Sequence, residues 1–228
     1  MEPGLVIAID GPAGSGKSSV SRAVATRLGL NYLDTGAMYR AITWAVLEAG
    51  IDPDDAEAVA EFIEGRSEPL VESGIDPVNP AIEVEGVDVA DPIRGALVTE
   101  AVSAVSAVPS VRSHLVEQQR RYVSDSTVGI VVEGRDIGSV VLPDADLKVF
   151  LTADATVRAQ RRAAERLDGH DPSLDATKSA LVNRDAKDSS RAVSPLVRAS
   201  DAVEVDTSTM TFDDVVDTVV ELAKRART

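Results

Sequence analysis

One segment near the start of the chain constrains the fold more than any other. Residues 11–18 read Gly-Pro-Ala-Gly-Ser-Gly-Lys-Ser, the pattern of a phosphate-binding P-loop. The segment follows a short apolar run, Leu5–Ile9, and precedes residues at helical spacing that end at Gly29. A strand, a glycine-rich loop and a helix in this order predict an α/β unit that holds an anion where the helix begins.

The residues of this loop have separate expected roles. Its backbone N–H groups would point inward at the phosphates of a nucleotide. Lys17 is expected to reach the β- and γ-phosphates, and the Ser18 hydroxyl is expected to ligate Mg²⁺. The complete set that we predict to bind nucleotide is Gly11, Pro12, Ala13, Gly14, Ser15, Gly16, Lys17, Ser18 and Ser19.

Five short apolar runs predict one sheet. Helical patterns separate most of these runs, which favours a five-stranded parallel sheet flanked by helices, in a single domain over residues 1–228. Ligands bind at the carboxyl ends of the strands in such a sheet, where the P-loop, residues 34–36 and residues 133–136 all fall. The predicted strands are Leu5–Ile9, Leu30–Leu33, Val128–Val132, Leu147–Leu151 and Ala202–Val205.

Two further elements are marked by local patterns. Thr211 and Asp214 form a capping pair for a last helix, whose predicted apolar stripe is Phe212, Val215, Val216, Val219 and Leu222.

Residues 69–94 break the alternation of strands and helices, and alternating residues on both sides of Glu85-Gly86 predict a hairpin of 82–84 with 87–89. We interpret this stretch as a small β-rich insert; a plain surface excursion is the alternative.

Composition excludes several classes of protein. The chain has no cysteine, which rules out disulfides and thiolate zinc sites, and its net charge of −15 argues against nucleic-acid and membrane-surface partners. No apolar run approaches the length of a membrane span, and no basic segment of a signal peptide opens the chain, so we expect a cytoplasmic protein, and a monomer. Arginines nevertheless cluster in residues 158–166 and 184–198, either to bind small anions or as solvated helix faces.

Four stretches together carry a resemblance. They are residues 9–18, residues 33–40 (Leu-Asp-Thr-Gly-Ala-Met-Tyr-Arg), residues 133–138 (Glu-Gly-Arg-Asp-Ile-Gly) and residues 191–196 (Arg-Ala-Val-Ser-Pro-Leu). In this order, and with the β-rich insert, the sequence resembles the bacterial cytidylate kinases of the nucleoside monophosphate kinase family. The resemblance spans almost the whole chain. Glu133 departs from the family pattern, which often has Asp there.

The resemblance implies a P-loop kinase fold and a reaction. The γ-phosphoryl group of ATP, with Mg²⁺ bound, would pass to CMP or dCMP and give CDP or dCDP plus ADP. A region at about 35–110, including the insert at 69–94, would bind the monophosphate, and a lid would lie at about 155–170. Because the acceptor phosphate is already anionic, the chemistry needs positioning and charge neutralisation and no general base.

The family's site roles carry over to matching positions. The acceptor phosphate would be bound by Arg40, Arg135 and Arg191, and the sugar by Arg184 and Asp188. Lys17 would act on the transferred group together with the lid arginines Arg158 and Arg162.

Cytosine would be contacted by Ser103, Arg112 and Asp136, with Ser106 and Ser110 as alternatives for the serine. A carboxylate accepts from the exocyclic amine of cytosine and would repel the carbonyl of uracil, which favours Asp136 as the residue that reads the base. Thr35, Tyr39 and Gly134 complete the predicted acceptor site.

Other functions and roles stay open at this stage. A different P-loop kinase could act on UMP, AMP or shikimate, while a GTP-binding switch would need Asn-Lys-x-Asp and Asp-x-x-Gly patterns that the chain lacks. A module that only binds ATP would not need the three phosphate arginines.

Glu133 would hold a metal-bound water or make an ordinary strand-end contact. We assign no chemistry to His114 or His170, expect Trp44 to pack, and expect a solvated helix over 52–64.

Overall fold

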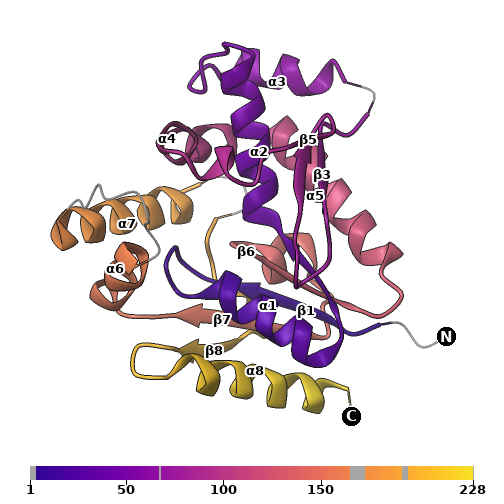
Figure 1. Ribbon diagram of the computed structural model, residues 1–228, viewed down its shortest axis with the longest axis vertical. Helices are drawn as coiled ribbons and strands as arrows, with labels where there is room; N and C mark the ends of the chain where they lie inside the picture. Colours follow the sequence, from indigo (N-terminus) through magenta and orange to yellow (C-terminus); the bar gives the residue numbers. More distant parts are fainter. Residues whose placement is uncertain (1–3, 67, 165–172, 192–194, 228) are drawn as a thin grey trace.

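The protein is built on one parallel sheet, as its computed structural model shows (Figure 1). The structure describes residues 4–66, 68–164, 173–191 and 195–227. The strand order is β2-β6-β1-β7-β8, and every neighbouring pair is parallel. The strands are β1 (Val6–Asp10), β2 (Asn31–Asp34), β6 (Ile130–Gly134), β7 (Leu147–Thr152) and β8 (Val203–Asp206). The predicted five-stranded parallel sheet is therefore confirmed.

Helices cover both faces of this sheet. They are α1 (Lys17–Leu28), α2 (Thr35–Glu48), α3 (Ala56–Glu64), α4 (Ala96–Val105), α5 (Pro109–Asp125), α6 (Ala155–Ala164), α7 (Leu174–Ser189) and α8 (Phe212–Ala226). The described residues also form a 3₁₀ turn (Pro92–Arg94) and a π-helical turn (Ile137–Val141).

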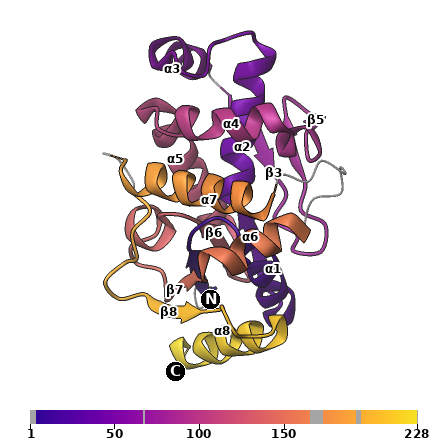
Figure 2. The same cartoon turned by 90° about the vertical axis from the view of Figure 1, so that its left-hand side faces the viewer.

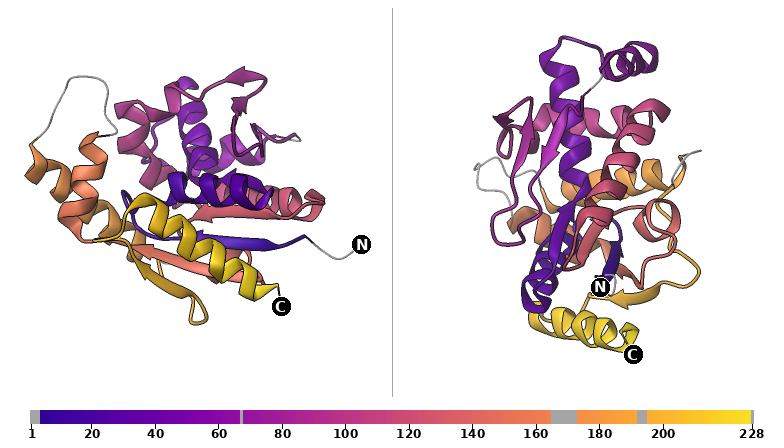
Figure 3. Two further views of the ribbon diagram at one scale, coloured as in Figure 1. Left: turned by 60° about the horizontal axis from the view of Figure 1, so that its bottom comes forward. Right: turned by 90° about the vertical axis from the view of Figure 1, so that its right-hand side faces the viewer.

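The alternation of side chains along β1 divides the core in two. Ala8 points into a cluster formed with α2, α5 and the insert, whereas Ile7 and Ile9 point into a cluster formed with α1 and α8. All three side chains are fully buried, as a central parallel strand requires. Figure 3 shows α1 and α8 lying together on their side of the sheet. Trp44 packs against the first cluster, as predicted.

The last helix has the predicted cap and one misplaced residue. Thr211 and Asp214 bond reciprocally as a capping box, and Val215, Val216 and Val219 are buried. Phe212, which we placed in the apolar stripe, is 51% exposed. It opens the helix three residues before Val215, the first α8 residue that packs on the core.

The β-rich insert is present and holds one strand more than predicted. β3 (Val71–Ser73), β4 (Ile82–Val84) and β5 (Val87–Asp88) form an antiparallel sheet in that order. Glu85 and Gly86 both adopt positive φ, the geometry of a type I′ hairpin turn. The insert packs on the same core cluster as α2 (Figure 1), and the residues after β3 reach the outer strand of the main sheet, where the N–H of Tyr32 on β2 donates to the carbonyl of Ile75.

Parts of two predicted segments lie outside the described residues. The region predicted as a lid, 155–170, is described to residue 164, where it forms α6. Residues 165–170, His170 among them, and residues 192–194 of the last motif are outside the described part. Among the described residues, no helix combines the length and the apolar character needed to cross a bilayer.

Candidate active site

The P-loop connects β1 to α1 and needs glycine where other chain segments approach it. A Cβ atom added at Gly11 would lie 2.1 Å from the carbonyl oxygen of Leu151 on β7. Gly14 has φ +74°, a left-handed conformation, and a Cβ there would lie 3.0 Å from the carbonyl oxygen of Arg158. The loop is thus packed directly against β7 and α6, and these contacts explain two of the glycines that mark it in the sequence.

Lys17 and Ser18 begin α1 beside the end of β6. The Lys17 ammonium donates to the carbonyl of Pro12 at 3.0 Å. Desolvation and the neighbouring guanidinium of Arg135 lower the pKa of Lys17 to about 8, so the group is still mostly cationic at neutral pH. The Ser18 hydroxyl donates to Oε2 of Glu133 at 3.0 Å, and the Tyr32 hydroxyl donates to Oε1.

Glu133 is a buried carboxylate with 2% of its surface exposed. Burial, followed by the charge of Asp34, raises its pKa to about 7. Its two oxygens and the Ser18 hydroxyl present hard oxygen donors next to the P-loop. Mg²⁺ prefers such donors and keeps most of its shell for water and phosphate oxygens, so these residues fit a magnesium ion.

Arginine side chains converge on the same edge of the sheet. Arg135, which follows β6, donates to the carbonyl of Gly11 at 3.1 Å and pairs with Asp188 at 3.3 Å. Arg191 pairs with the other oxygen of Asp188 at 2.6 Å. The i,i+4 pair of Arg184 with Asp188 that the spacing allowed is not among the ion pairs of the described residues, and Arg184 Nε is buried there without a hydrogen-bond partner.

The crowding of these guanidinium groups is visible in their pKa values. Burial and the positive charge of Arg135 lower the pKa of Arg184 to about 9, and burial and the positive charge of Arg162 lower the pKa of Arg40 to about 10. A guanidinium normally stays protonated far above these values. Positive charges held this close are stabilised by anions, so the arrangement is suited to phosphate groups.

A second buried site lies next to the arginines. Arg112 on α5 and Asp136 after β6 form an ion pair of 2.5 Å, with both side chains about 5% exposed. The Arg112 guanidinium lies over the ring of Tyr39, 5.3 Å from its centroid, and donates to the carbonyl of Ser106. Because Arg191 donates to the Ser106 hydroxyl at 2.9 Å, this site is continuous with the arginines described above.

Comparison with known proteins identifies the family to which this geometry belongs. The family described as cytidylate kinase matches residues 7–225 of the chain. The chain belongs to the cytidylate kinase family. A cytidylate kinase of Streptomyces avermitilis is 56% identical over 225 residues, which cover 99% of this chain and 95% of that protein. One of Nocardia farcinica is 54% identical over 214 residues, with 93% and 90% covered.

Among solved structures, an uncharacterised protein of Eubacterium ventriosum has a TM-score of 0.50 at 11% identity. The match covers 96% of this chain and 98% of that one. At this identity the likeness concerns the fold alone. The resemblance to cytidylate kinases that the four sequence stretches carried is confirmed by the family match.

The cytidylate kinase residues predicted from the sequence fall into two groups. Most of them meet at the carboxyl edge of the sheet: the P-loop with Lys17 and Ser18, the three arginines Arg135, Arg184 and Arg191, and the pair Arg112–Asp136. Arg40 lies at their margin, bonded to the carbonyl of Ile93 and the hydroxyl of Thr99. Arg158 is buried, and donates to the carbonyls of Ala13 and Ala153.

Other predicted residues have packing contacts in the structure. Thr35 is buried and its hydroxyl donates to the Glu133 carbonyl at 2.7 Å. A Cβ at Gly134 would lie within 2.7 Å of atoms of Ile137 and Thr35, so this glycine permits close packing. Ser19 is exposed on α1, where it lines a shallow hollow with Arg22. Ser103 offers its carbonyl to Ser106, and Ser106 is the serine in direct contact with Arg112 and Arg191.

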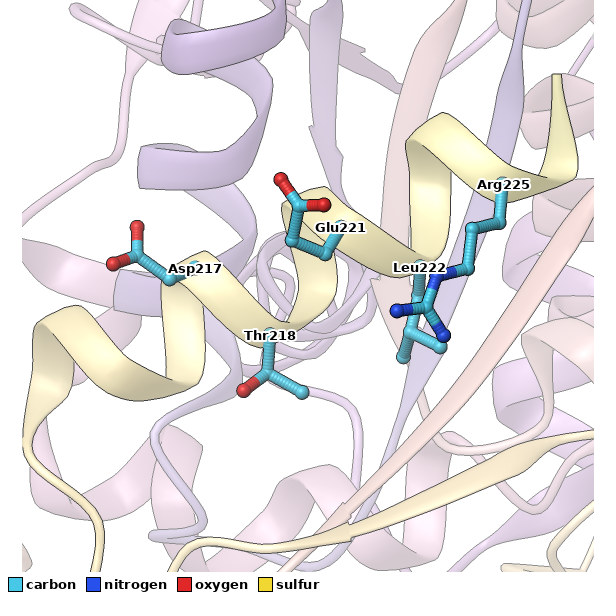
Figure 4. A pocket seen from close by; sticks show the side chains of 5 residues that line it. All are labelled: Asp217, Thr218, Glu221, Leu222 and Arg225. Atoms are coloured by element: carbon cyan, nitrogen blue, oxygen red, sulfur yellow. The ribbon is translucent and has the colours of Figure 1, made fainter.

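Sequence reasoning missed several polar residues of this site. Tyr32 reads as one more apolar member of a strand, although its hydroxyl bonds Glu133. Asp185 reads as one acid in a charged helix, yet it contacts the P-loop. A hollow on α8 lies away from this site, at the end of the molecule opposite α3 (Figure 1). It is lined by Asp217, Thr218, Glu221, Leu222 and Arg225, none of which is a predicted site residue (Figure 4).

Proposed function

We propose that the protein transfers the γ-phosphoryl group of ATP to the phosphate of CMP or dCMP. Membership of the cytidylate kinase family supports this reaction. One observation carries the proposal. Arg135 donates to the P-loop carbonyl of Gly11 and also pairs with Asp188, which in turn pairs with Arg191. The side chain of Arg135 therefore connects the P-loop to the neighbouring arginines. An enzyme that joins two phosphate-bearing substrates needs such a meeting point.

The reaction then follows from charge and position. An oxygen of the acceptor phosphate attacks the γ-phosphorus, a new P–O bond forms, and the bond to the bridging oxygen breaks as ADP leaves. The acceptor oxygen is already anionic, so no side chain has to remove a proton. Lys17 would neutralise charge on the β- and γ-phosphates, and Arg158 and Arg162 would add positive charge from the side of α6.

The acceptor would be oriented by three groups of side chains. Arg40, Arg135 and Arg191 would bind its phosphate. Arg184 and Asp188 would contact its sugar, as the family pattern implies. These roles are supported by where the side chains lie, at the edge of the sheet that also carries the P-loop.

Base selection would depend on Asp136 and Arg112. Asp136 would accept from the exocyclic amine of cytosine, and Arg112, held by Asp136 and by the carbonyl of Ser106, would fix the ring. Because both side chains are buried, a uracil carbonyl facing the Asp136 carboxylate would be strongly disfavoured. Ser106 is favoured over Ser103 as the serine of this site by its contacts with Arg112 and Arg191.

We also propose that Mg²⁺ acts with ATP, held by the Ser18 hydroxyl and the carboxylate of Glu133. When bound, the ion screens the charge of the phosphates. The hydrogen bond from Ser18 to Oε2 of Glu133 keeps the hydroxyl and the carboxylate together beside Lys17. The Tyr32 hydroxyl fixes the carboxylate further by donating to Oε1.

The larger-scale expectations remain proposals. Residues 35–110 would bind the monophosphate, with the insert at 69–94 forming part of that region, and residues 155–170 would act as the lid. We propose a cytoplasmic monomer that acts on small nucleotides and binds neither nucleic acid nor membranes. The net charge of −15 supports the last point, because it repels both kinds of polyanion.

The decisive experiment measures ADP formation from Mg-ATP with one acceptor at a time: CMP, dCMP, UMP, AMP, GMP and shikimate. Rapid turnover that is largely confined to CMP and dCMP is the expected result. Faster turnover of UMP, AMP or shikimate would replace the proposed acceptor. Nucleotide binding without turnover of any acceptor would favour a regulatory ATP- or GTP-binding protein.

A further inference from the structure

Asp185 on α7 lies against the P-loop in a position that suits a phosphate oxygen. The backbone N–H of Ala13, in the middle of the loop, donates to Oδ1 of Asp185 at 3.3 Å. The other carboxylate oxygen, Oδ2, bonds the guanidinium of Arg158. Arg135 lies 3.7 Å from Oδ1. A P-loop amide and two arginines are the groups expected to bind the phosphates of a nucleotide, and here they surround a carboxylate.

The packing of α7 explains how this carboxylate reaches the loop. α7 lies alongside α6, with α4 on its other side (Figure 2). The Asp185 side chain is 17% exposed, so its interactions with the neighbouring charges are only partly screened by water. Asp188, one turn further along the same helix, pairs with Arg135 and Arg191. α7 therefore presents carboxylates to arginines on both the P-loop side and the acceptor side.

The arginines do not depend on Asp185 for their positions. Arg158 also donates to the carbonyls of Ala153 and Ala13, each at 3.1 Å. Arg135 also donates to the carbonyl of Gly11 at 3.1 Å. What Asp185 adds to this site is a negative charge. This charge repels a polyphosphate that approaches the loop. The Asp185 carboxylate also accepts from the Ala13 N–H, a group that the polyphosphate would bind.

We propose that Asp185 is an internal anion of the P-loop, which occupies part of the phosphate site before the nucleotide binds and is displaced when it does. This inference rests on the proposed function, because it takes the P-loop as the site of ATP. It makes Asp185 a residue that weakens nucleotide binding. Displacement of Asp185 also takes a negative charge away from Arg135, which stays bonded to Gly11 and paired with Asp188, so less of the Arg135 charge is compensated when the acceptor phosphate arrives. Asp185 would thereby couple the binding of the two substrates.

The test is a calorimetric titration of the full chain, without acceptor. The ligands are a non-hydrolysable ATP analogue and inorganic tripolyphosphate, so that effects on the phosphate chain are separated from effects on adenosine. The variants are Asp185→Asn, Asp185→Ala and Asp185→Glu. The matched control is Asp175→Asn, which removes the same charge from an exposed position in the first turn of the same helix.

Asp185→Asn and Asp185→Ala are expected to bind both ligands roughly tenfold more tightly than the wild type, since a negative charge beside an anion site is lost. Asp185→Glu should return toward the wild-type affinity, and Asp175→Asn should stay within about twofold of it. A purely structural role predicts a lower unfolding temperature and no gain in affinity. Unchanged or weaker tripolyphosphate binding by both uncharged variants would overturn the inference.

The same titration separates this inference from the proposed function. If the wild type binds tripolyphosphate but not the ATP analogue, the assignment of ATP to the loop fails. The effect of Asp185 on anion binding is still measured in that case, because the tripolyphosphate titrations of the wild type and its variants do not involve adenosine.

Discussion

Arg191 is one of the three arginines that we propose to bind the acceptor phosphate. Its side chain is 12% exposed and contacts Asp188 and the Ser106 hydroxyl. Arg191→Ala should raise the KM for CMP by about 10- to 100-fold, the loss of one or two charge-assisted hydrogen bonds, while the KM for ATP stays within about twofold. Steady-state kinetics with each substrate varied in turn measure this. Arg198→Ala is the control, because Arg198 pairs with Glu204 on the surface. An equal rise in both KM values would contradict the assignment.

Asp10 links the stability of the protein to pH. Its carboxylate accepts from the N–H groups of Ile137 and Gly138, each at 2.8 Å, yet burial outweighs these bonds and raises its pKa to about 6. The unfolded pKa is near 3.9. Between these values the folded protein binds the proton more often than the unfolded chain does. This residue's contribution to the free energy of unfolding is therefore complete below about pH 4 and is lost as the pH rises through 6.

The measurement compares the wild type with Asp10→Asn by urea unfolding at pH 7, 6 and 5. The free energy of unfolding of the wild type should rise relative to that of the variant by about 1 kcal/mol as the pH falls from 7 to 5. Asp54→Asn, at an exposed position, should show no such trend. A difference between wild type and Asp10→Asn that is constant with pH would show that Asp10 does not titrate in this range.

The element with the clearest local signals is α8. The Thr211 hydroxyl oxygen accepts from the backbone N–H of Asp214, and the backbone N–H of Thr211 donates to the Asp214 carboxylate in return. Thr211→Ala should lower the free energy of unfolding by about 1 kcal/mol and leave both KM values unchanged. Thr218→Ala on the same helix should be close to neutral, since that hydroxyl only bonds back to the carbonyl of Asp214. Chemical denaturation of the two variants side by side tests this, and equal losses would argue against the cap.

Strands and helices were predictable because their signals are local. β6 begins two residues later than predicted because Val128 is exposed and Gly129 has φ +92°, a conformation that the residue pattern does not show. β3 was missed because it has three residues and pairs with a strand nine or more residues away. The strand order was not predicted either, since it depends on crossovers and not on the residues of any one strand.

The candidate site shows the same limit more sharply. Lys17 and Ser18 were identified because a contiguous motif contains them. Asp185 was not identified, and Ser106 was named only as an alternative to Ser103, because both are defined by contacts with residues far away in the sequence, such as Ala13 and Arg191. No spacing in the chain encodes those contacts. Only the packing of α7 against α6 and α4 brings them together.

At the scale of the whole molecule, the charge of the chain and the charge of its site have opposite signs. The net charge is −15, yet Arg135 lies close enough to Arg40 and Arg184 for its positive charge to lower the pKa of both, after burial. This concentration of like charge is unfavourable in the absence of an anion, and a bound anion relieves it. Occupancy of one small site should therefore change the stability of the entire fold.

Inorganic tripolyphosphate should raise the unfolding temperature in a way that salt does not. At about 100 times its Kd, a ligand of the folded state adds about 2.7 kcal/mol, which corresponds to roughly 5–10 °C for a chain of this size. Sodium chloride at equal ionic strength screens charges without occupying the site, so it should give a much smaller shift. Differential scanning calorimetry measures both.

The arginines of the site predict which variants lose the rise in unfolding temperature that tripolyphosphate causes. Arg184→Gln removes a partly buried guanidinium from the cluster and should reduce the tripolyphosphate shift to less than half. Arg121→Gln removes the same charge from the surface, where Arg121 pairs with Glu117 at 3.4 Å, and should leave the shift intact. If both variants kept the full shift, or if sodium chloride matched tripolyphosphate, the anion would be stabilising the protein through its overall charge. Since the chain as a whole is acidic, a gain that depends on Arg184 can come only from a local site that holds the anion against the field of the rest of the molecule.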